Sequence, residues 1–417
     1  MGLDLAQECG FRAGNLDVRG LSVRTRRDDH GDVRKLLIGL IAATLAGLAC
    51  LSVWPKFHDP VTWTPDALFY EARLLEIRGT PHDAAFQRTF DGPISSELRS
   101  RDPGKTGNPQ WVKYNEPFYE RRVALPLAGA ALYPAAGDRS LLYLSLAGYV
   151  ASIVALFGLL LLRFRLWIAA AITLGAILLP PLRNHSSYPL TDSWGLALET
   201  SAFAAALITL KRGLRWLPLW IAAIALLGFT RDSTWIPVLA AGWIALRYRS
   251  RVPVTLFASG VAAALPALLA FTTPVRTLLA ELVNNSEPPA DTSWSFIVRH
   301  YPHAVVDLIR ADVGFLRRGE WYTTAYLVGG VLALFVLVWR RRLRDPGTSL
   351  LTAGAFLGFA YVLAAPVFSA FRLELVFVPM AAYGLGLLTE LVAARVAERD
   401  LSLDRAAVRV PARARRP

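Results

Sequence analysis

Cysteine and charge are both scarce in this chain of 417 residues. Its two cysteines are Cys9, in a polar stretch, and Cys50, inside an apolar run, so no disulfide bond is expected between them. Charged residues make up 18% of the chain, whereas soluble domains average about a quarter. Hydrophobic residues reach 54% and mean hydropathy is +0.38. These values predict a membrane protein.

Several catalytic and binding motifs are also missing. The chain has no Walker sequence, no HExxH and no GxSxG, which argues against an ATP-driven pump, a zinc protease and a serine hydrolase of the usual kinds. No zinc-ligand or nucleic-acid-binding pattern accompanies the net charge of +13. Gly329 and Gly330 have no glycine four residues away, so they form no GxxxG helix-packing motif. No internal repeat is found.

Apolar runs of membrane-spanning length recur along the chain and predict an all-α polytopic membrane protein with about ten transmembrane helices. The first run follows a long polar segment and lacks a small-residue cleavage site, so it is expected to remain as an anchor. The predicted spans are 36–54, 140–162, 166–182, 192–210, 215–230, 233–247, 253–272, 321–339, 348–367 and 373–394.

The loops between these runs predict the orientation. Short loops on one side contain twelve Lys and Arg and no acid, whereas the short loops on the other side contain only three arginines. The positive-inside rule places the basic side, and both basic tails, in the cytoplasm. The predicted organisation is a tail over 1–35, a membrane domain over 36–394 with outer loops 55–139 and 273–320, and a basic, disordered tail over 395–417. The basic loops are 163–165, 211–215, 247–251 and 340–344.

The first outer loop contains predicted interfacial helices. Thr64-Pro65-Asp66 is typical of a helix start, with Thr as the N-cap and Pro at the first helical position, and Gly79 is a plausible stop. A second helix is predicted to begin near Pro117 and to run towards Tyr133. The intervening segment 91–110 is rich in Gly, Pro and Ser and is expected to be a mobile loop.

Ionisable residues at the ends of apolar runs are the strongest functional signal, because charge at membrane depth is costly. Arg231-Asp232 joins two predicted spans: the pair either caps a helical hairpin as a local ion pair, or Arg231 grips a phosphate or carboxylate. Arg372 either snorkels to lipid headgroups or pairs with a partner inside the bundle, and the same pairing is expected of Glu374, which falls near the start of an apolar run. Asp192 is interpreted as a helix cap, an explanation that fits the deeper Glu199 less well.

Two outer-loop features add chemistry to these charges. Asp66 either acts as a general base on a hydroxyl or stands in the first helical turn for electrostatic reasons alone. The segment 115–122 combines aromatic, acidic and basic groups, and is interpreted either as a sugar- or phosphate-binding wall or as an interfacial helix with arginines on lipid phosphate. In the first interpretation Tyr119 stacks on the ligand while Arg121 and Arg122 bind an anion.

With one span followed by a large outer loop carrying an early acid, the chain resembles the GT-C glycosyltransferases, which use lipid-phosphate sugars at the outer face of a membrane. The resemblance is topological over nearly the whole chain. It matches Asp66, in Thr64-Pro65-Asp66-Ala67-Leu68-Phe69-Tyr70, to the family's essential acid, and Arg231 and Arg372 to its outward-facing basic positions. Many members have two adjacent acids or Asp-x-Asp there, whereas the next acid here is Glu71, so the need for a divalent cation stays open.

The resemblance implies an inverting transfer of a sugar from a polyprenyl-phosphate donor to a glycan, lipid or protein acceptor in the cell envelope. The catalytic residue would be Asp66, and no cofactor or metal ligand is assigned. The location is the plasma (inner) membrane. The alternative is a multi-pass transporter or flippase of a lipid-linked or anionic substrate; a third class is a non-catalytic subunit of an envelope-assembly complex. The sugar, the acceptor and the oligomeric state are not determined. The predicted substrate contacts are Tyr70, Glu71, Tyr119, Arg121, Arg122, Arg231, Asp232 and Arg372.

Overall fold

A computed structural model describes residues 26–101, 103–270, 274–284, 287–318, 320–341, 345–367, 369 and 371–408. The chain divides into two compact units, one ending at Ile41 and the other beginning at Ala42. All residues of the candidate site belong to the second unit. The predictions for Cys9, for the tail up to residue 25 and for the tail beyond Val408 lie outside the described residues.

The described residues are helical and contain no strand, which confirms the predicted all-α class. The helices up to the middle of the chain are α1 (Arg26–Ser52), α2 (Pro65–Ile77), α3 (His82–Phe86), α4 (Ser96–Arg101), α5 (Pro109–Tyr119), α6 (Ala124–Ala136), α7 (Ser140–Leu161), α8 (Leu166–Ile177), α9 (Pro180–Ser186) and α10 (Asp192–Arg212). The later ones are α11 (Leu217–Gly228), α12 (Trp235–Tyr248), α13 (Arg251–Leu269), α14 (Val275–Val283), α15 (Trp294–Arg317), α16 (Trp321–Thr323), α17 (Gly329–Arg341), α18 (Pro346–Ala364) and α19 (Val378–Val408).

Seven stretches of the described chain are long and apolar enough to cross a membrane. The bent pair α8–α9, with 61° between its helices, makes an eighth if it is counted as one span. The shorter helices α11 and α12 stand at the other two predicted positions, so the count of ten stays a prediction. The seven are Asp32–Ser52, Ala124–Leu161, Asp192–Arg212, Arg251–Leu269, Trp321–Arg340, Pro346–Ala364 and Glu374–Val396.

Large apolar side chains lie exposed along these helices. Trp339 on α17 is 86% exposed, and Leu246 on α12 and Leu269 on α13 are also exposed. A surface with this much exposed apolar area is unfavourable in water and matches the hydrocarbon of a bilayer. The exposed surface therefore agrees with a multi-pass membrane protein.

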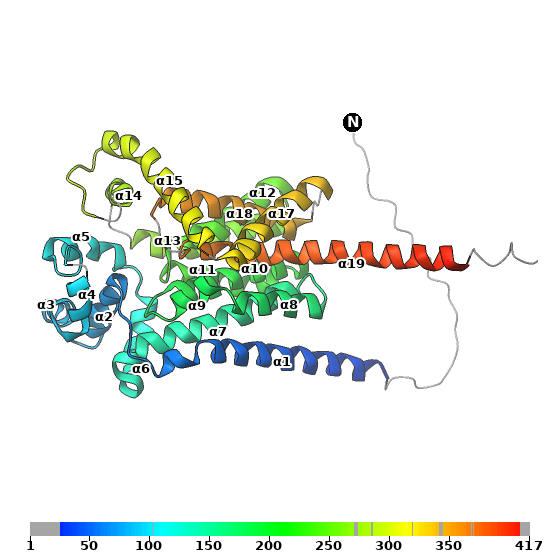
Figure 1. Ribbon diagram of the computed structural model, residues 1–417, viewed down its shortest axis with the longest axis horizontal. Helices are drawn as coiled ribbons and strands as arrows, with labels where there is room; N and C mark the ends of the chain where they lie inside the picture. The colour runs from blue at the N-terminus through cyan, green and yellow to red at the C-terminus, as the bar shows by residue number, and fades with distance from the viewer. Residues whose placement is uncertain are drawn as a thin grey trace, which may run out of the picture. The chain divides into compact units, whose positions relative to one another are not determined.

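Within the second unit, α10 packs against α7 and α11, α12 against α13 and α18, and α17 against α19. Figure 1 shows these long helices running in nearly the same direction, with α2 to α5 and α14 gathered beyond one end. The helices of the two predicted outer loops therefore lie at the same end of this unit.

The contact between α17 and α19 depends on glycine. A Cβ atom added to Gly384 would lie 2.0 Å from the carbonyl oxygen of Gly330, so neither backbone could approach so closely with a larger residue at that position. The two glycines belong to different helices, which is why a search for GxxxG within one helix does not find this packing.

The first outer segment agrees with the prediction at its start and departs from it later. Thr64 caps α2 by accepting a hydrogen bond from the backbone of Ala67, and Gly79 follows the helix with φ +95°. Pro117 does not begin a helix but lies inside α5, and α6 begins only at Ala124. Segment 91–110 is not one loop, because η3 (Pro93–Ser95) and α4 occupy part of it.

The C-terminal tail also departs from the prediction. The helix α19 continues to Val408, so residues 395–408 are helical and not disordered. This segment is rich in Ala, Arg and Leu, which have high helix propensity, and it prolongs an already formed helix without a new nucleation step.

Candidate functional site

Asp66 is positioned by the start of α2. The Thr64 cap and Pro65 fix the first turn, so the carboxylate lies at the N-terminal end of the helix. Leu68 and Phe69 anchor the same turn in an aromatic cluster with Phe90, Trp111 and neighbouring side chains. The position of Asp66 is therefore set by the cap and by the packing of the residues that follow it on its own helix.

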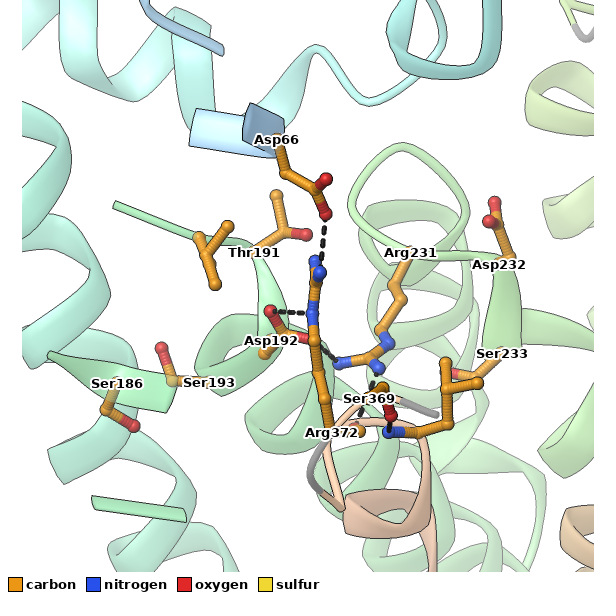
Figure 2. A network of polar contacts seen from close by, with 12 residues as sticks. Asp66, Ser186, Thr191, Asp192, Ser193, Arg231, Asp232, Ser233, Ser369 and Arg372 are labelled. Atoms are coloured by element: carbon orange, nitrogen blue, oxygen red, sulfur yellow. Dashed lines mark hydrogen bonds and ion pairs between the residues drawn. The ribbon is translucent and has the colours of Figure 1, made fainter. Parts of the chain in front are cut away.

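Asp192 is the centre of a buried charge network. Its carboxylate accepts from Nε of Arg372 at 2.9 and 2.8 Å and forms an ion pair with Arg231, while only 1% of the residue is exposed. The far end of the Arg372 guanidinium donates to Asp66 at 2.5 Å. Figure 2 shows the resulting chain, in which Arg372 lies between the two aspartates and Arg231 lies beside Asp192.

This arrangement corrects the interpretation of Asp192 as a cap. The N-cap of α10 is Thr191, whose side chain makes no capping hydrogen bond, and Asp192 stands in the first turn with two arginine partners. Removing either buried partner would leave an uncompensated charge. Asp192 is thus a residue of the network that the sequence analysis missed.

Backbone geometry makes room for the two arginines. Gly195, one turn into α10, faces Arg231, and a Cβ atom there would lie 2.7 Å from the Cδ atom of that arginine. Arg231 also donates to the backbone carbonyl of Arg372 at 3.1 Å. Phe371 has φ +65°, a left-handed conformation that a bulky residue rarely adopts. Strain of this kind, of order 1–3 kcal/mol, persists only where the surroundings enforce it.

A second group of charges lies between α5 and α6. Arg121 and Arg122 both form ion pairs with Asp232, in the 3₁₀ segment η6 (Asp232–Thr234). Arg122 also donates to the Tyr70 hydroxyl at 3.2 Å, and this hydroxyl lies 3.2 Å from the Thr191 hydroxyl. Thr191 directly precedes Asp192, so Tyr70 connects the two groups of charge.

The neighbouring residues Arg231 and Asp232 therefore do not form the local ion pair that was one of their two interpretations. Arg231 pairs with Asp192, whereas Asp232 pairs with the arginines of the first outer segment. Figure 2 shows the Asp232 side chain on the far side of Arg231 from Asp192. A tight hairpin thus presents two adjacent charges to two different groups of partners.

Tyr119 completes the surroundings of Asp66. Its hydroxyl donates to the Asp66 carboxylate at 2.7 Å, and its ring stacks on Phe69 with centroids 4.4 Å apart. Burial raises the pKa of Asp66, but Arg372 and the hydrogen bond from Tyr119 outweigh this effect and hold the pKa below its usual value. Asp66 is therefore ionised at neutral pH, with both oxygens engaged.

The second outer segment also reaches the network. The Phe315 ring on α15 stacks on Phe371, with centroids 5.2 Å apart, and Asp312 lies close enough to Glu374 for their charges to repel. Burial raises the pKa of Asp312 to about 6. The residue after the strained Phe371 is Arg372, so α15 covers the backbone that presents this arginine.

Among the described residues, Glu199 lies near Arg231 but forms no ion pair with it. Glu199, deeper in α10, is buried and accepts a hydrogen bond from Ser233 at 3.0 Å. In the described part of the chain, no group of three or more His, Cys, Asp or Glu side chains is arranged to hold a metal ion. No side chain in this part of the chain is therefore assigned as a metal ligand.

Glu71 is the one predicted substrate contact that the structure separates from the others. It follows Tyr70 on α2, but one residue turns a helix by about 100°, and its charged neighbours are Asp138, Arg88 and Arg78. Only 1% of the residue is exposed and one carboxylate oxygen has no hydrogen-bond partner. Burial, with a smaller effect of Asp138, raises its pKa to about 7.

We expect Glu71→Gln to stabilise the protein at alkaline pH. The folded chain holds the Glu71 proton up to about pH 7, whereas the unfolded chain loses it near 4.5, so the wild type loses stability between these values as pH rises. The loss is about 3 kcal/mol above pH 7, and the amide avoids it. Thermal unfolding in detergent at pH 5 and pH 8 measures the effect. The prediction would be contradicted if Glu71→Gln gained no more stability at pH 8 than at pH 5. An equal gain in stability in the exposed control Glu97→Gln would also contradict it.

A cavity of about 930 Å³ lies away from these charges. The cavity is lined by the second half of α12 and the first parts of α13 and α18. Because α12 begins next to Arg231, its second half lies away from that arginine. Its walls are mainly apolar and contain no acid. The charge network, and not this cavity, is therefore the candidate functional site.

The structure thus brings eight of the nine predicted site residues into one connected network and adds Asp192 to them. The connections are the ion pairs and hydrogen bonds described above, and Glu71 alone lies outside. A comparison of the chain with models of known protein families and with curated proteins finds no match. The roles of these residues are consequently inferred from their geometry and charge.

Proposed function

We propose that this protein is a membrane glycosyltransferase that moves a sugar from a polyprenyl-phosphate donor to a glycan, lipid or protein acceptor. One observation carries the proposal: an ionised carboxylate on an outer-segment helix, Asp66, is linked through Arg372 to a cluster that includes Arg231 and Arg122. Four arginines against three aspartates leave this cluster with one excess positive charge. Such a site attracts a phosphate group while keeping a carboxylate beside it.

Ten membrane crossings fit the contacts better than seven. The helix α10 has 21 residues, and α11 with the preceding η5 (Leu214–Trp216) has 15, yet Arg231 just after α11 contacts Asp192 at the start of α10. The end of α11 therefore lies at the same membrane depth as the start of α10, although α11 is the shorter helix. The two helices form a hairpin that covers the same depth. The same reasoning applies to α12 and α13. The helix α12 begins at the depth of Asp192 and runs away from it, and α13 packs along α12.

The orientation follows from the charge of the loops. The arginine- and lysine-rich turns, such as 163–165 and 211–215, lie at the ends of α7 and α10 that are remote from Asp192. By the positive-inside rule those turns face the cytoplasm, together with both termini, and the charge network faces outwards. The plasma (inner) membrane is the proposed location, because glycosyltransferases that use lipid-phosphate sugars, which the chain resembles, imply it.

In the proposed reaction, an acceptor hydroxyl attacks the anomeric carbon of the donor, and the bond from that carbon to the phosphate oxygen breaks with inversion. The hydroxyl proton passes to Asp66, and polyprenyl phosphate leaves. Arg231 and Arg372 stabilise the charge that grows on the departing phosphate, with Arg121 and Arg122 at the same group. Because Asp66 is paired with Arg372 in the substrate-free protein, the arriving phosphate must take over Arg372 before Asp66 is available as a base.

The direct test uses purified protein in liposomes with polyprenyl-phosphate sugars of several kinds and acceptor glycans. Formation of a glycosidic product with release of polyprenyl phosphate is the expected result. The competing class, a flippase or transporter, predicts movement of the intact lipid-linked substrate between leaflets without bond cleavage. Transbilayer movement with no product from any donor would reject the enzyme.

We expect Arg122→Gln to raise KM for the donor by about tenfold to a hundredfold, which is the effect of losing a charge-assisted hydrogen bond. Arg122 pairs with Asp232, whose side chain is 29% exposed, so a ligand phosphate can compete for this arginine. Initial rates at varied donor concentration measure the effect. Arg101→Gln, on the exposed face of α4, is the matched control. An unchanged KM in Arg122→Gln would remove this arginine from the phosphate site.

A further inference from the structure

Glu281 is a buried acid that the network described above does not use. It lies on α14, in the second outer segment, with 5% of the residue exposed. Among the described residues, its carboxyl group has no ion pair, and no hydrogen bond to it is found. Most buried polar groups have a hydrogen-bond partner within the protein, so the unpartnered carboxyl of Glu281 is available to form a hydrogen bond with a ligand.

Packing brings Glu281 towards the first outer segment. The Tyr114 hydroxyl on α5 donates to the backbone carbonyl of Thr277 at 3.4 Å, and Thr277 lies about one turn before Glu281 on the same helix. On another side, Ala280 and Val283 pack against Ile297 of α15. The helix α14 is thus held between α5 and α15.

The carboxyl of Glu281 lies close enough to Asp66 for the negative charge of Asp66 to act on it. Asp66 is the residue that Arg372 and Tyr119 hold ionised, and neither of these reaches Glu281. Two neighbouring carboxyls cannot both ionise cheaply. The proton of the pair therefore resides on Glu281.

The groups that surround Glu281 keep this proton in place. From α2 it faces Asp66, and from α5 it faces Tyr114. The α15 residues packed near α14 include Tyr301, whose hydroxyl donates to the Leu363 carbonyl. Burial, with the added charge of Asp66, raises the pKa of Glu281 to about 8.

We propose that Glu281 binds the acceptor: as an uncharged acid it donates a hydrogen bond to an oxygen of the hydroxyl-bearing acceptor, on the side of Asp66 away from the arginines. This inference rests on the proposed function. It divides the site into a donor side, where arginines hold phosphate, and an acceptor side, where Asp66 and Glu281 face a polar, uncharged, polyhydroxylated molecule such as a glycan. Protonated Glu281 can donate a hydrogen bond and ionised Asp66 can accept one. Together the two side chains orient a hydroxyl group of the acceptor molecule for attack.

The arrangement predicts an alkaline limit to activity. Above about pH 8, Glu281 loses its proton, and the resulting carboxylate can no longer donate to the acceptor and repels Asp66. We expect kcat/KM for the acceptor to fall about tenfold for each further pH unit, as for a single essential proton. KM for the donor, measured with saturating acceptor at pH 7, is expected to be unaffected by this residue.

Three variants in one assay series test the inference. Glu281→Gln keeps a hydrogen-bond donor without a titratable proton, so we expect near wild-type KM for the acceptor at pH 7 and no alkaline fall linked to this residue. Glu281→Leu removes the donor and is expected to raise KM for the acceptor about tenfold with an unchanged KM for the donor. Glu287→Gln, an exposed residue of the same outer segment, is the control.

Two results would overturn the inference while leaving the proposed function in place: the same alkaline fall in Glu281→Gln as in the wild type, or an unchanged acceptor KM in Glu281→Leu. Thermal unfolding of each variant, measured alongside, separates a misfolded protein from one with a damaged acceptor side. Absence of transfer in the wild type and in Glu287→Gln, with every donor tried, is a different outcome. It would reject the glycosyltransferase and the acceptor role of Glu281 together.

Discussion

Replacing Asp66 by Asn is expected to lower the rate of sugar transfer by about a thousandfold, because a positioned general base contributes about 10²–10⁴. The variant keeps the size of the side chain and removes its ability to accept the proton of the acceptor hydroxyl. Folding should survive, since Arg372 retains its bonds to Asp192 and Asp66 is partly exposed. The loss of the Asp66–Arg372 pair should cost less than the roughly 3–5 kcal/mol of an uncompensated buried charge, because Arg372 keeps Asp192 as its partner.

The measurement is single-turnover transfer by variant and wild type at equal donor occupancy. Donor binding should be retained or strengthened, because Arg372 no longer has Asp66 as a competing partner. Asp83→Asn is the matched control: Asp83 also stands in the first turn of a helix of the first outer segment, but it is exposed. Transfer at the wild-type rate by Asp66→Asn would exclude Asp66 as the base.

Replacing Asp192 by Asn should destabilise the protein by about 3–5 kcal/mol, the usual result of removing one partner from a buried ion pair. The carboxylate compensates Arg231, of which 7% of the side chain is exposed, and also binds Nε of Arg372. If Asp192 were only a helix cap, the cost would be about 1 kcal/mol. The size of the effect therefore distinguishes the two roles.

Thermal unfolding in detergent provides this measurement, with a double-mutant cycle as its control. The double variant Asp192→Asn/Arg231→Gln removes both charges, so it should be more stable than Asp192→Asn alone. A loss in the double variant equal to the sum of the losses in Asp192→Asn and Arg231→Gln, each measured alone, would show that the pair is not coupled. A loss near 1 kcal/mol in Asp192→Asn would restore the cap interpretation.

Asp66 and the start of α2 show what local sequence predicts well. A Thr cap, a Pro at the first helical position and an apolar face act within a few residues of one another, and the helix forms as these signals predict. The all-helical class follows in the same way from apolar runs, because a chain in lipid must satisfy its backbone hydrogen bonds internally. The break between α5 and α6 was missed because Pro117, interpreted as a helix start, lies inside α5.

The partners of the charges could not be predicted in this way. Arg372 binds Asp66, which is 306 positions away in sequence, and Asp192, which is 180 positions away. Asp232 stands next to Arg231 yet pairs with Arg121 and Arg122 instead. Spacing along the chain carries no information about contacts between elements so far apart, and an arginine beside an aspartate gives a misleading local signal.

The apolar helices themselves add to this difficulty. A helix that is hydrophobic on all sides has no stripe to reveal which face is inward, so the rotation of α10, and with it the burial of Asp192, depends on how its neighbours pack. The same reason explains Glu71 and Glu281. Glu71 was predicted as a substrate contact and instead has Asp138 as a neighbour, and Glu281 comes near Asp66 only through the packing of α14.

The sequence by itself determined the helical class, the position of the apolar runs and the end of the bundle at which Asp66, Arg231 and Arg372 gather, because hydropathy and loop charge are additive properties of local segments. Only the tertiary structure decided which acid holds which arginine, placed Asp192 at the centre and separated Glu71 from the site. Pairing of buried charges depends on side-chain direction and on distances of a few ångströms, which arise only when all the helices are packed together.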